Sequence, residues 1–424
     1  MTYREALEYL YGLQRFGLRL GLDVPRRLAG AFGCPQDGLK FLHVAGTNGK
    51  GSTCAFLESA CRASGRRVGL FTSPHLVSFR ERIQIDRQPI PEDAVARWVR
   101  QLRLVTDTFP TDQHPTFFEV VTVLALLWFR EQGCDLVVWE TGMGGRLDAT
   151  NIVSPLATLV TPIGWDHQQW LGNTLAAIAG EKAGIFKPGV PALTTALEPE
   201  ALDVLHATAT ACHAPWRHVR PGDPETVWLH DVHLPLPGPH QELNAALAVA
   251  AVRTLKPILP ITDSDLRRGL ESTHWPGRFE VYSENGRVRV LDGAHNPPAF
   301  EALADTLDLQ FPGQSYSLVL GMLADKDPVA AVARLVPGAR RTVVVPVRTP
   351  RSIAPEVLAR HCADVPGGAG PVACASSLAE ALALLANEDL VVITGSLYLV
   401  GEAMELRLGT TDSERGLNDW SPSR

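Results

Sequence analysis

The stretch FLHVAGTNGKGST, residues 41–53, is the strongest local signal in this chain of 424 residues. It begins with an apolar run, continues through Gly46, Gly49 and Gly51, and leads into the apolar spacing of a helix. Glycines allow backbone N–H groups to point into a loop, and the N-terminus of the following helix adds positive potential. Lys50 can then reach between the β- and γ-phosphates of a nucleotide. The stretch predicts a strand, a phosphate-binding loop and a helix.

The loop departs from the strict P-loop pattern. Val44 stands where the first glycine of that pattern would fall, and Gly51 intervenes before Ser52. At this point an ordinary glycine-rich turn between a strand and a helix remains the alternative.

Apolar runs of similar length recur along the chain, separated by helical patterns. Such runs, bounded by turn signals, predict buried strands of parallel sheets in an α/β protein. The predicted strands are 41–44, 68–71, 136–140, 157–161, 287–291, 317–320, 342–347 and 390–394, and helices are predicted at 298–307 and 378–385.

A Pro- and Gly-bearing stretch at 272–278 separates the two series of strands. It predicts a domain boundary near residue 276, with domains 1–276 and 277–424. Residues 196–240, rich in Pro and His, are expected to form small β elements at the edge of the first domain. The polar tail from about residue 409 is expected to be disordered.

The composition excludes several classes of protein. A net charge of −7 argues against a nucleic-acid binder that relies on bulk charge. No apolar stretch approaches the roughly 18 residues of a membrane span. Seven scattered cysteines without a CxxC pair indicate reduced thiols and predict a cytoplasmic protein. Lysine is scarce, at six of 39 Lys and Arg residues, so a lysine in a motif raises the question of what chemistry requires lysine rather than arginine there.

A second group of chemically active side chains follows two of the predicted strands. Glu140 ends the run LVVWE and precedes a glycine-rich turn, where α/β sheets place their ligands. Its carboxylate could bind Mg²⁺ directly or through water. Asp166 and His167 follow the next strand, although His167 could equally be structural. Lys182 lies in a helix–turn–Pro segment close in sequence to these residues.

Together these motifs resemble the folylpolyglutamate synthase/dihydrofolate synthase family of the Mur ligase superfamily, and favour a bifunctional bacterial member. They follow one another in order from residue 43 to residue 402. The matching stretches are HVAGTNGKGST (43–53), TSPHLVSFRERIQI (72–85), TFFEVVT (116–122), ETGMGGRLDATN (140–151), DHQQWLG (166–172), EKAGIFKPG (181–189), HQELNAALA (240–248), WPGRFE (275–280), LDGAHNP (291–297) and GSLYLVGE (395–402).

The resemblance implies a P-loop NTPase-like parallel-sheet domain followed by a smaller Rossmann-like α/β domain. It also implies an ATP-dependent amide ligase of folate biosynthesis and one-carbon metabolism. The carboxylate of dihydropteroate or a reduced folate would attack the γ-phosphate of ATP, and the amine of L-glutamate would displace phosphate from the acyl phosphate. ATP is then the co-substrate, Mg²⁺ is implied at two sites, and K⁺ is left open. The resemblance indicates a monomer without nucleic-acid or membrane partners.

Site residues carry over position by position. The implied ATP-binding residues are Gly49, Lys50, Gly51, Ser52, Asn244, Arg278 and Asp292. The implied Mg²⁺ positions are Ser73, Glu140 and His167. The implied catalytic residues are Lys50, Lys182, Asp292 and His295. Lys182 matches a lysine that is carbamylated in the family, a reaction that requires a neutral amine and so excludes arginine.

Two segments resemble the dihydropteroate site of the bifunctional members. Aromatic rings can stack on a flat pterin, and carboxylates can accept its N–H groups. The residues concerned are Thr116, Phe117, Phe118, Glu119, Leu147, Asp148 and Ala149. Phe117 and Phe118 could equally begin a buried helix, and relatives restricted to folylpolyglutamate synthesis have similar strings. A monofunctional enzyme, a Mur-like ligase acting on another carboxylate, and a P-loop kinase without ligase activity are the alternatives.

Overall fold

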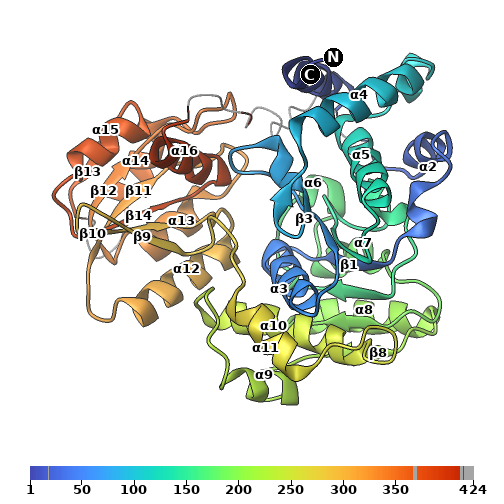
Figure 1. The fold of residues 1–424 in the computed structure, drawn as a ribbon. Coiled ribbons are helices and arrows are strands. Elements are labelled where there is room, and N and C mark those ends of the chain that lie inside the picture. Colours follow the sequence, from blue (N-terminus) through green and yellow to red (C-terminus); the bar gives the residue numbers. More distant parts are fainter. Residues whose placement is uncertain (18, 366–369, 411–413, 415–424) are drawn as a thin grey trace.

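The computed structural model describes residues 1–17, 19–365, 370–410 and 414. Two mainly parallel sheets lie side by side, each covered by helices on both faces (Figure 1). The α/β class and the two-part architecture expected from the sequence are confirmed.

The first sheet has eight strands in the order β4-β3-β2-β5-β1-β6-β7-β8. Only β3 and β4, at one edge, run antiparallel to their neighbours. The strands are β1 Phe41–Ala45, β2 Val68–Phe71, β3 Ile83–Ile85, β4 Gln88–Pro89, β5 Leu136–Glu140, β6 Ala157–Val160, β7 Ala192–Thr194 and β8 Trp216–His218.

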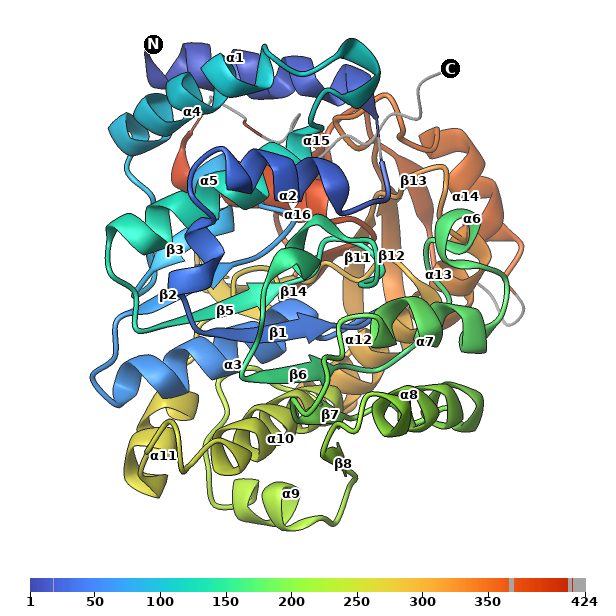
Figure 2. The same ribbon diagram turned by 90° about the vertical axis from the view of Figure 1, so that its right-hand side faces the viewer.

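Side chains alternate across this sheet, so its two faces join different cores. Phe41 and Trp139 pack beneath one group of helices, whereas Leu42 and Val44 pack beneath the other. The first group is α1 Tyr3–Gly12, α2 Asp23–Gly30, α4 Glu92–Thr106 and α5 Phe117–Glu131; the second is α3 Lys50–Ala63, α10 Pro239–Thr254 and α11 Asp263–Glu271 (Figure 2). The remaining helices and 3₁₀ turns of this part are η1 Leu13–Phe16, η2 Pro35–Gly38, η3 Phe79–Arg82, η4 Thr111–Gln113, η5 Ala149–Ile152, α6 Gln168–Leu171, α7 Leu175–Ala183, α8 Pro199–Ala211 and α9 Pro224–Leu229.

The second sheet has six strands in the order β13-β12-β11-β14-β10-β9, with β9 antiparallel at one edge. The strands are β9 Glu280–Glu284, β10 Arg287–Leu291, β11 Tyr316–Leu320, β12 Ala339–Val344, β13 Val372–Cys374 and β14 Leu390–Thr394. The helices are α12 Pro297–Gln310, α13 Pro328–Leu335, α14 Pro355–Ala363, α15 Leu378–Leu384 and α16 Leu397–Leu408. Leu76, from the loop after β2, is buried in the core of this second sheet and so ties the two parts together.

The sequence-based strands agree closely with the structure, with two corrections. The strand expected at 342–347 occupies Ala339–Val344. The expectation of small β elements across 196–240 is only partly met: β8 is a short strand at the edge of the first sheet, whereas α8 and α9 are helices that were not expected. In α8, Ala201, Leu205 and Ala209 recur at a spacing of four and are all buried, which is the pattern of a helix face.

Two expectations concern regions at which the structure gives little or no test. The boundary near residue 276 stays a prediction; it falls between the last helix before the second sheet and β9. Most of the tail expected to be disordered lies outside the described residues. Its described member Glu414 accepts hydrogen bonds from Tyr3 and Ser78.

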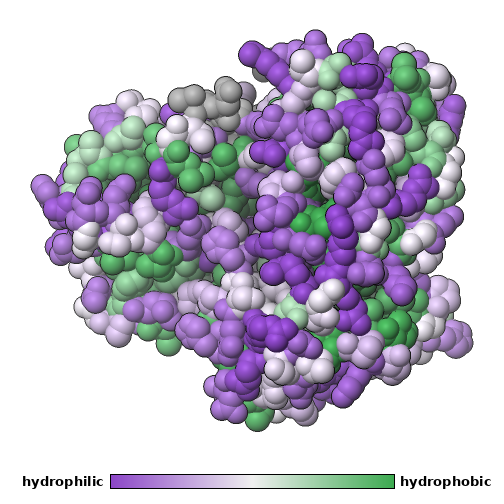
Figure 3. Space-filling view, viewed as in Figure 1, coloured by the Kyte–Doolittle hydropathy of each residue, from purple (hydrophilic) through white to green (hydrophobic). Residues whose placement is uncertain are grey.

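Hydrophilic residues predominate on the face shown in Figure 3, with hydrophobic groups scattered among them. Within the described part of the chain, no helix is both long and apolar enough to cross a membrane.

Candidate active site

Two positions in the loop between β1 and α3, Gly46 and Gly49, leave no room for a side chain. Gly46 has φ 149° and Gly49 has φ 86°. A Cβ on Gly46 would lie 1.8 Å from the Thr161 hydroxyl oxygen, and one on Gly49 would lie 2.3 Å from Oδ1 of Asn244. Glycine is therefore required at both positions, by space as well as by backbone conformation.

Two lysines converge on this loop. The Lys50 ammonium donates to the carbonyl oxygens of Gly46 and Thr47, both at 3.1 Å. The Lys182 ammonium donates to the same Gly46 carbonyl at 2.8 Å. Lys182 is only 4% exposed, and this burial, reinforced by the charge of Lys50, lowers its pKa to about 7. Near neutral pH a large fraction of this amine is therefore uncharged.

The carboxylate of Glu140 lies beside the loop because β1 and β5 are paired in register, Val44 opposite Glu140. The Ser73 backbone N–H donates to Glu140 at 2.9 Å, which brings these two predicted residues together. Burial raises the pKa of Glu140, and the charge of Lys50 is the largest effect opposing that rise.

Oxygen donors of this kind suit Mg²⁺, which keeps waters and substrate phosphates among its ligands. No group of three or more His, Cys, Asp or Glu side chains able to hold a metal ion occurs within the described ranges. The contact between Ser73 and Glu140 is made by the Ser73 backbone N–H, so the structure brings these two predicted residues together without forming a metal cluster in the described part of the chain.

Asp166, in the loop after β6, is surrounded by basic side chains. Its carboxylate lies 2.7 Å from the Lys326 ammonium, 3.9 Å from Nε2 of His295 and 3.8 Å from Nε2 of His167. Burial alone would raise the pKa of Asp166, but these neighbours together hold it below its usual range. His167 has φ 51°, and its side chain is 47% exposed. Lys326, to which the sequence assigned no role, thus links the second sheet to the loop that carries His167.

The loop after β10 faces the phosphate loop. The side-chain amides of Asn48 and Asn296 exchange two hydrogen bonds of 2.9 Å. Asp292 accepts the backbone N–H groups of Phe279 and Ala294, both at 2.8 Å. Burial lowers the pKa of the Arg278 guanidinium, and the charge of Asp292 opposes that effect most strongly. His295 is held by its own loop, with Nδ1 2.7 Å from the Gly293 carbonyl oxygen.

The remaining predicted ATP-binding residues lie at or beside the loop between β1 and α3. Asn244, buried on α10, donates to Gln241 at 3.0 Å and turns its oxygen toward Gly49. Ser52 is buried in the first turn of α3. A Cβ on Gly51 would lie 2.9 Å from the indole nitrogen of Trp275, so lack of space also favours glycine at this position.

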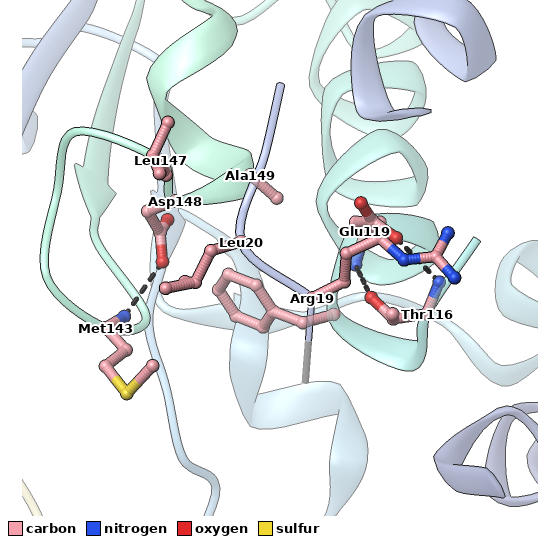
Figure 4. A pocket seen from close by; sticks show the side chains of 9 residues that line it. Arg19, Leu20, Thr116, Glu119, Met143, Leu147, Asp148 and Ala149 are labelled. Atoms are coloured by element: carbon pink, nitrogen blue, oxygen red, sulfur yellow. Dashed lines mark hydrogen bonds between the residues drawn. The ribbon is translucent and has the colours of Figure 1, made fainter. Parts of the chain in front are cut away.

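A small cavity of about 20 Å³ lies between α5 and the turn after β5 (Figure 4). Its lining includes every residue predicted for pteroate except Phe117, whose ring lies 5.4 Å from the Arg82 guanidinium and packs edge-on against Phe79. This volume accommodates about one water, so a bicyclic ring would require the lining to move. The lining residues are Arg19, Leu20, Thr116, Phe118, Glu119, Met143, Leu147, Asp148 and Ala149.

Three of these lining residues, Arg19, Leu20 and Met143, were not predicted. Met143 lies within the motif at 140–151, which was a usable signal, whereas Arg19 and Leu20 belong to no recognised motif. Phe117 and Phe118 also begin a buried helix, which was the alternative to a substrate role, because α5 starts at Phe117 with Thr116 as its capping residue.

Comparisons with known proteins agree with this geometry. Residues 44–197 match the Mur ligase middle domain, and residues 277–397 match the Mur ligase glutamate ligase domain. The dihydrofolate synthase/folylpolyglutamate synthase of Bacillus subtilis is 38% identical over 79% of this chain and 83% of its own length. The chain belongs to the dihydrofolate synthase/folylpolyglutamate synthase family.

Other members of the family show the same relationship over almost the whole chain. The dihydrofolate synthase/folylpolyglutamate synthase of Escherichia coli is 35% identical over 94% of both chains. The structure of E. coli FolC in complex with DHPP and ADP has a TM-score of 0.83 at 32% identity, over 96% of this chain and 98% of that one. The family prediction is therefore confirmed, and the protein is an ATP-dependent ligase.

Proposed function

We propose that this ligase joins L-glutamate to dihydropteroate and to reduced folates, with ATP as co-substrate and Mg²⁺ as cofactor. The observation that carries the proposal is the pairing of β1 with β5, which places the two-lysine phosphate loop beside Glu140. The turn after β5 leads to the cavity lined by Thr116, Glu119 and Asp148. In this proposal, the carboxyl ends of these two central strands carry a phosphate site next to a pocket whose carboxylates bind a flat heterocycle.

The chemistry follows from these charges. The substrate carboxylate attacks the γ-phosphorus, the bond to the bridging oxygen of ADP breaks, and an acyl phosphate forms. Lys50 and the N-terminus of α3 stabilise the phosphate charge that develops. The glutamate amine then attacks the acyl carbon, and inorganic phosphate leaves with formation of the amide. Mg²⁺, held by Ser73 and Glu140 with His167 at the rim, would neutralise phosphate charge.

We propose that Lys182 carries the carbamate. Its neutral amine adds to CO₂ and releases a proton, and burial with a pKa of about 7 supports this reaction by keeping much of the amine uncharged. The product is an anion in place of a cation at the Gly46 carbonyl. The lysine would then leave that hydrogen bond and offer oxygen ligands to a second Mg²⁺.

The same proposal assigns the nucleotide contacts of the second part to Arg278 and Asp292, with His295 beside them. It takes residues 1–276 and 277–424 as the two domains and the enzyme as a cytoplasmic monomer. Seven free cysteines, with no disulfide, are consistent with a reducing compartment. K⁺ dependence is left to measurement.

The decisive experiment incubates pure protein with MgATP and L-glutamate, and supplies dihydropteroate or a reduced folate in parallel. Mass spectrometry should find the glutamyl adduct in both reactions, with one phosphate released per amide. Omission of L-glutamate is the control. Product from the folate alone would make the enzyme monofunctional, and product from neither would indicate a Mur-like ligase for another carboxylate.

A further inference from the structure

Asp148 enters the small cavity with both carboxylate oxygens already engaged (Figure 4). One oxygen accepts the Met143 backbone N–H at 2.8 Å. The other accepts the backbone N–H of Thr150 at 3.0 Å and the Thr150 hydroxyl at 2.5 Å. Asp148 is 5% exposed, so its position is set by these contacts rather than by solvent.

Thr150 is itself held by two side chains from neighbouring strands. His43 on β1 and Trp139 on β5 are register partners and lie on the same face of the sheet. The Trp139 indole N–H donates to the Thr150 carbonyl oxygen at 3.0 Å. Nε2 of His43 lies 3.1 Å from the Thr150 hydroxyl oxygen. His43, Trp139 and Thr150 are all fully buried, so water does not compete for these hydrogen bonds.

Counting protons determines the state of the histidine. The Thr150 hydroxyl has one proton. Burial raises the pKa of Asp148, and the hydrogen bonds from the backbone N–H groups of Met143, Thr150 and Gly142 and from the Thr150 hydroxyl oppose that rise by favouring the ionised carboxylate. The hydroxyl therefore donates to Asp148 and accepts from His43, so Nε2 of His43 carries the ring proton. Nδ1 has no hydrogen-bond partner among the described residues, as fits a bare acceptor. Burial keeps the ring neutral, with its pKa lowered to about 3.

We propose that His43, Thr150 and Trp139 are positioning residues that fix Asp148 for recognition of the heterocyclic substrate. This inference rests on the proposed function, in which Asp148 accepts the N–H groups of that substrate. The two strands that hold Thr150 also carry the chemistry, because β1 leads into the phosphate loop and β5 ends at Glu140. A shift of Asp148 would therefore move the substrate carboxylate relative to the phosphate that it must attack.

The hydrogen bonds from His43 to the Thr150 hydroxyl and from that hydroxyl to Asp148 form a relay, which Thr150→Val tests. Valine preserves the shape of the threonine side chain and removes both hydrogen bonds of its hydroxyl. We expect the KM for dihydropteroate and for reduced folate to rise about 10- to 100-fold, as for loss of a hydrogen bond to a charged group. The KM for ATP should stay unchanged. Thr150→Ser should restore the wild-type KM. The matched control is Thr194→Val, a fully buried threonine on β7 that donates to the Val160 carbonyl oxygen at 2.7 Å; it should leave both KM values unchanged.

Asp148→Asn separates the two levels of the proposal. If this variant keeps a normal KM for the pteroate and folate substrates, the substrate role of Asp148 is wrong and the relay has no function to serve. If Asp148→Asn raises that KM and Thr150→Val does not, the proposed function stands and the positioning role is overturned.

A measurement on the wild-type protein is independent of how the variants fold. Histidine-labelled protein, examined by ¹⁵N NMR with His43→Gln used for assignment, should show His43 with a protonated Nε2 and no titration between about pH 5.5 and 8.5. A ring protonated at Nδ1 instead would reverse the hydrogen bonds and overturn the relay.

Discussion

At the scale of single residues, two lysines on one carbonyl oxygen are an unusual use of charge. Lys50 and Lys182 both donate to Gly46. Burial is the main reason for the lowered pKa of Lys182, and the like charge of Lys50 lowers it further. An incoming phosphate relieves that repulsion for Lys50, while a carbamate would relieve it for Lys182.

Lys50→Ala should abolish phosphate release while leaving the fold intact. The ammonium stabilises charge that grows during phosphoryl transfer, so its loss should lower kcat by on the order of 10³-fold or more. Phosphate release under saturating ATP and circular dichroism measure the two parts of this prediction. Near-normal turnover would show that the loop does not bind the transferred phosphate through Lys50.

Lys182 should show a carbamate signal in ¹³C NMR after incubation with ¹³C-labelled bicarbonate, and Lys182→Arg should lose both that signal and activity. The sign of the pH dependence follows from the pKa of about 7. Below it the amine is protonated and cannot react, so activity should fall as the pH drops through 7. An unmodified amine in wild-type protein, together with an active Lys182→Arg enzyme, would contradict this assignment.

At the scale of elements, the start of α3 illustrates how backbone and packing combine. Gly49 has a positive φ and lies against Asn244, whereas Gly65, just beyond the end of the same helix, has φ 83° with open space around it. The two glycines thus share one backbone requirement and differ in their surroundings.

Gly49→Ala should raise the KM for ATP at least about tenfold, because the added methyl group displaces Asn244 and the loop. Gly65→Ala is the matched control: it should lose about 1 kcal/mol of unfolding free energy and keep a normal KM for ATP. Denaturant unfolding and ATP titration distinguish the two effects. Equal KM values in both variants would mean that backbone strain alone explains the glycine at position 49.

At the scale of the whole molecule, a few polar contacts set how the two sheets meet around the site. Asn48 pairs with Asn296, and Asp166 pairs with Lys326. The ion pair is the more sensitive of the two, since both of its side chains are nearly buried, at 14% and 12% exposed. Removing one partner leaves a buried charge without its closest counter-ion.

Lys326→Met should loosen this junction and lower kcat/KM by roughly 10- to 100-fold, the scale of a broken buried pair. Lys256→Met, at an exposed lysine of the first part, should have no effect. Asp166→Asn added to Lys326→Met should cost less than the sum of the single changes, because both remove one interaction. Strictly additive losses, measured by kinetics and small-angle scattering, would show that the two side chains act independently.

Residue types and their spacing were sufficient to predict the strands, the phosphate loop and the family. Buried parallel strands and glycine-rich turns leave local patterns, as in residues 41–53. The motifs that resemble the family occur in a fixed order along the chain. The helices within 196–240 were not predicted, because the Pro and His content of that segment obscured the helical spacing of Ala201, Leu205 and Ala209.

Only the tertiary structure could place residues that meet across long distances in the chain. Lys326, from the loop after β11, reaches Asp166 in the loop after β6 across the two sheets. Arg19 lines the cavity together with Asp148, and the position of His43 on β1, which pairs with β5, brings its ring to Thr150. No local pattern encodes such contacts, since each depends on sheet order and on how the two sheets are joined. The same holds for the charge state of Lys182, which follows from burial and from the nearby Lys50 ammonium rather than from its neighbours in sequence.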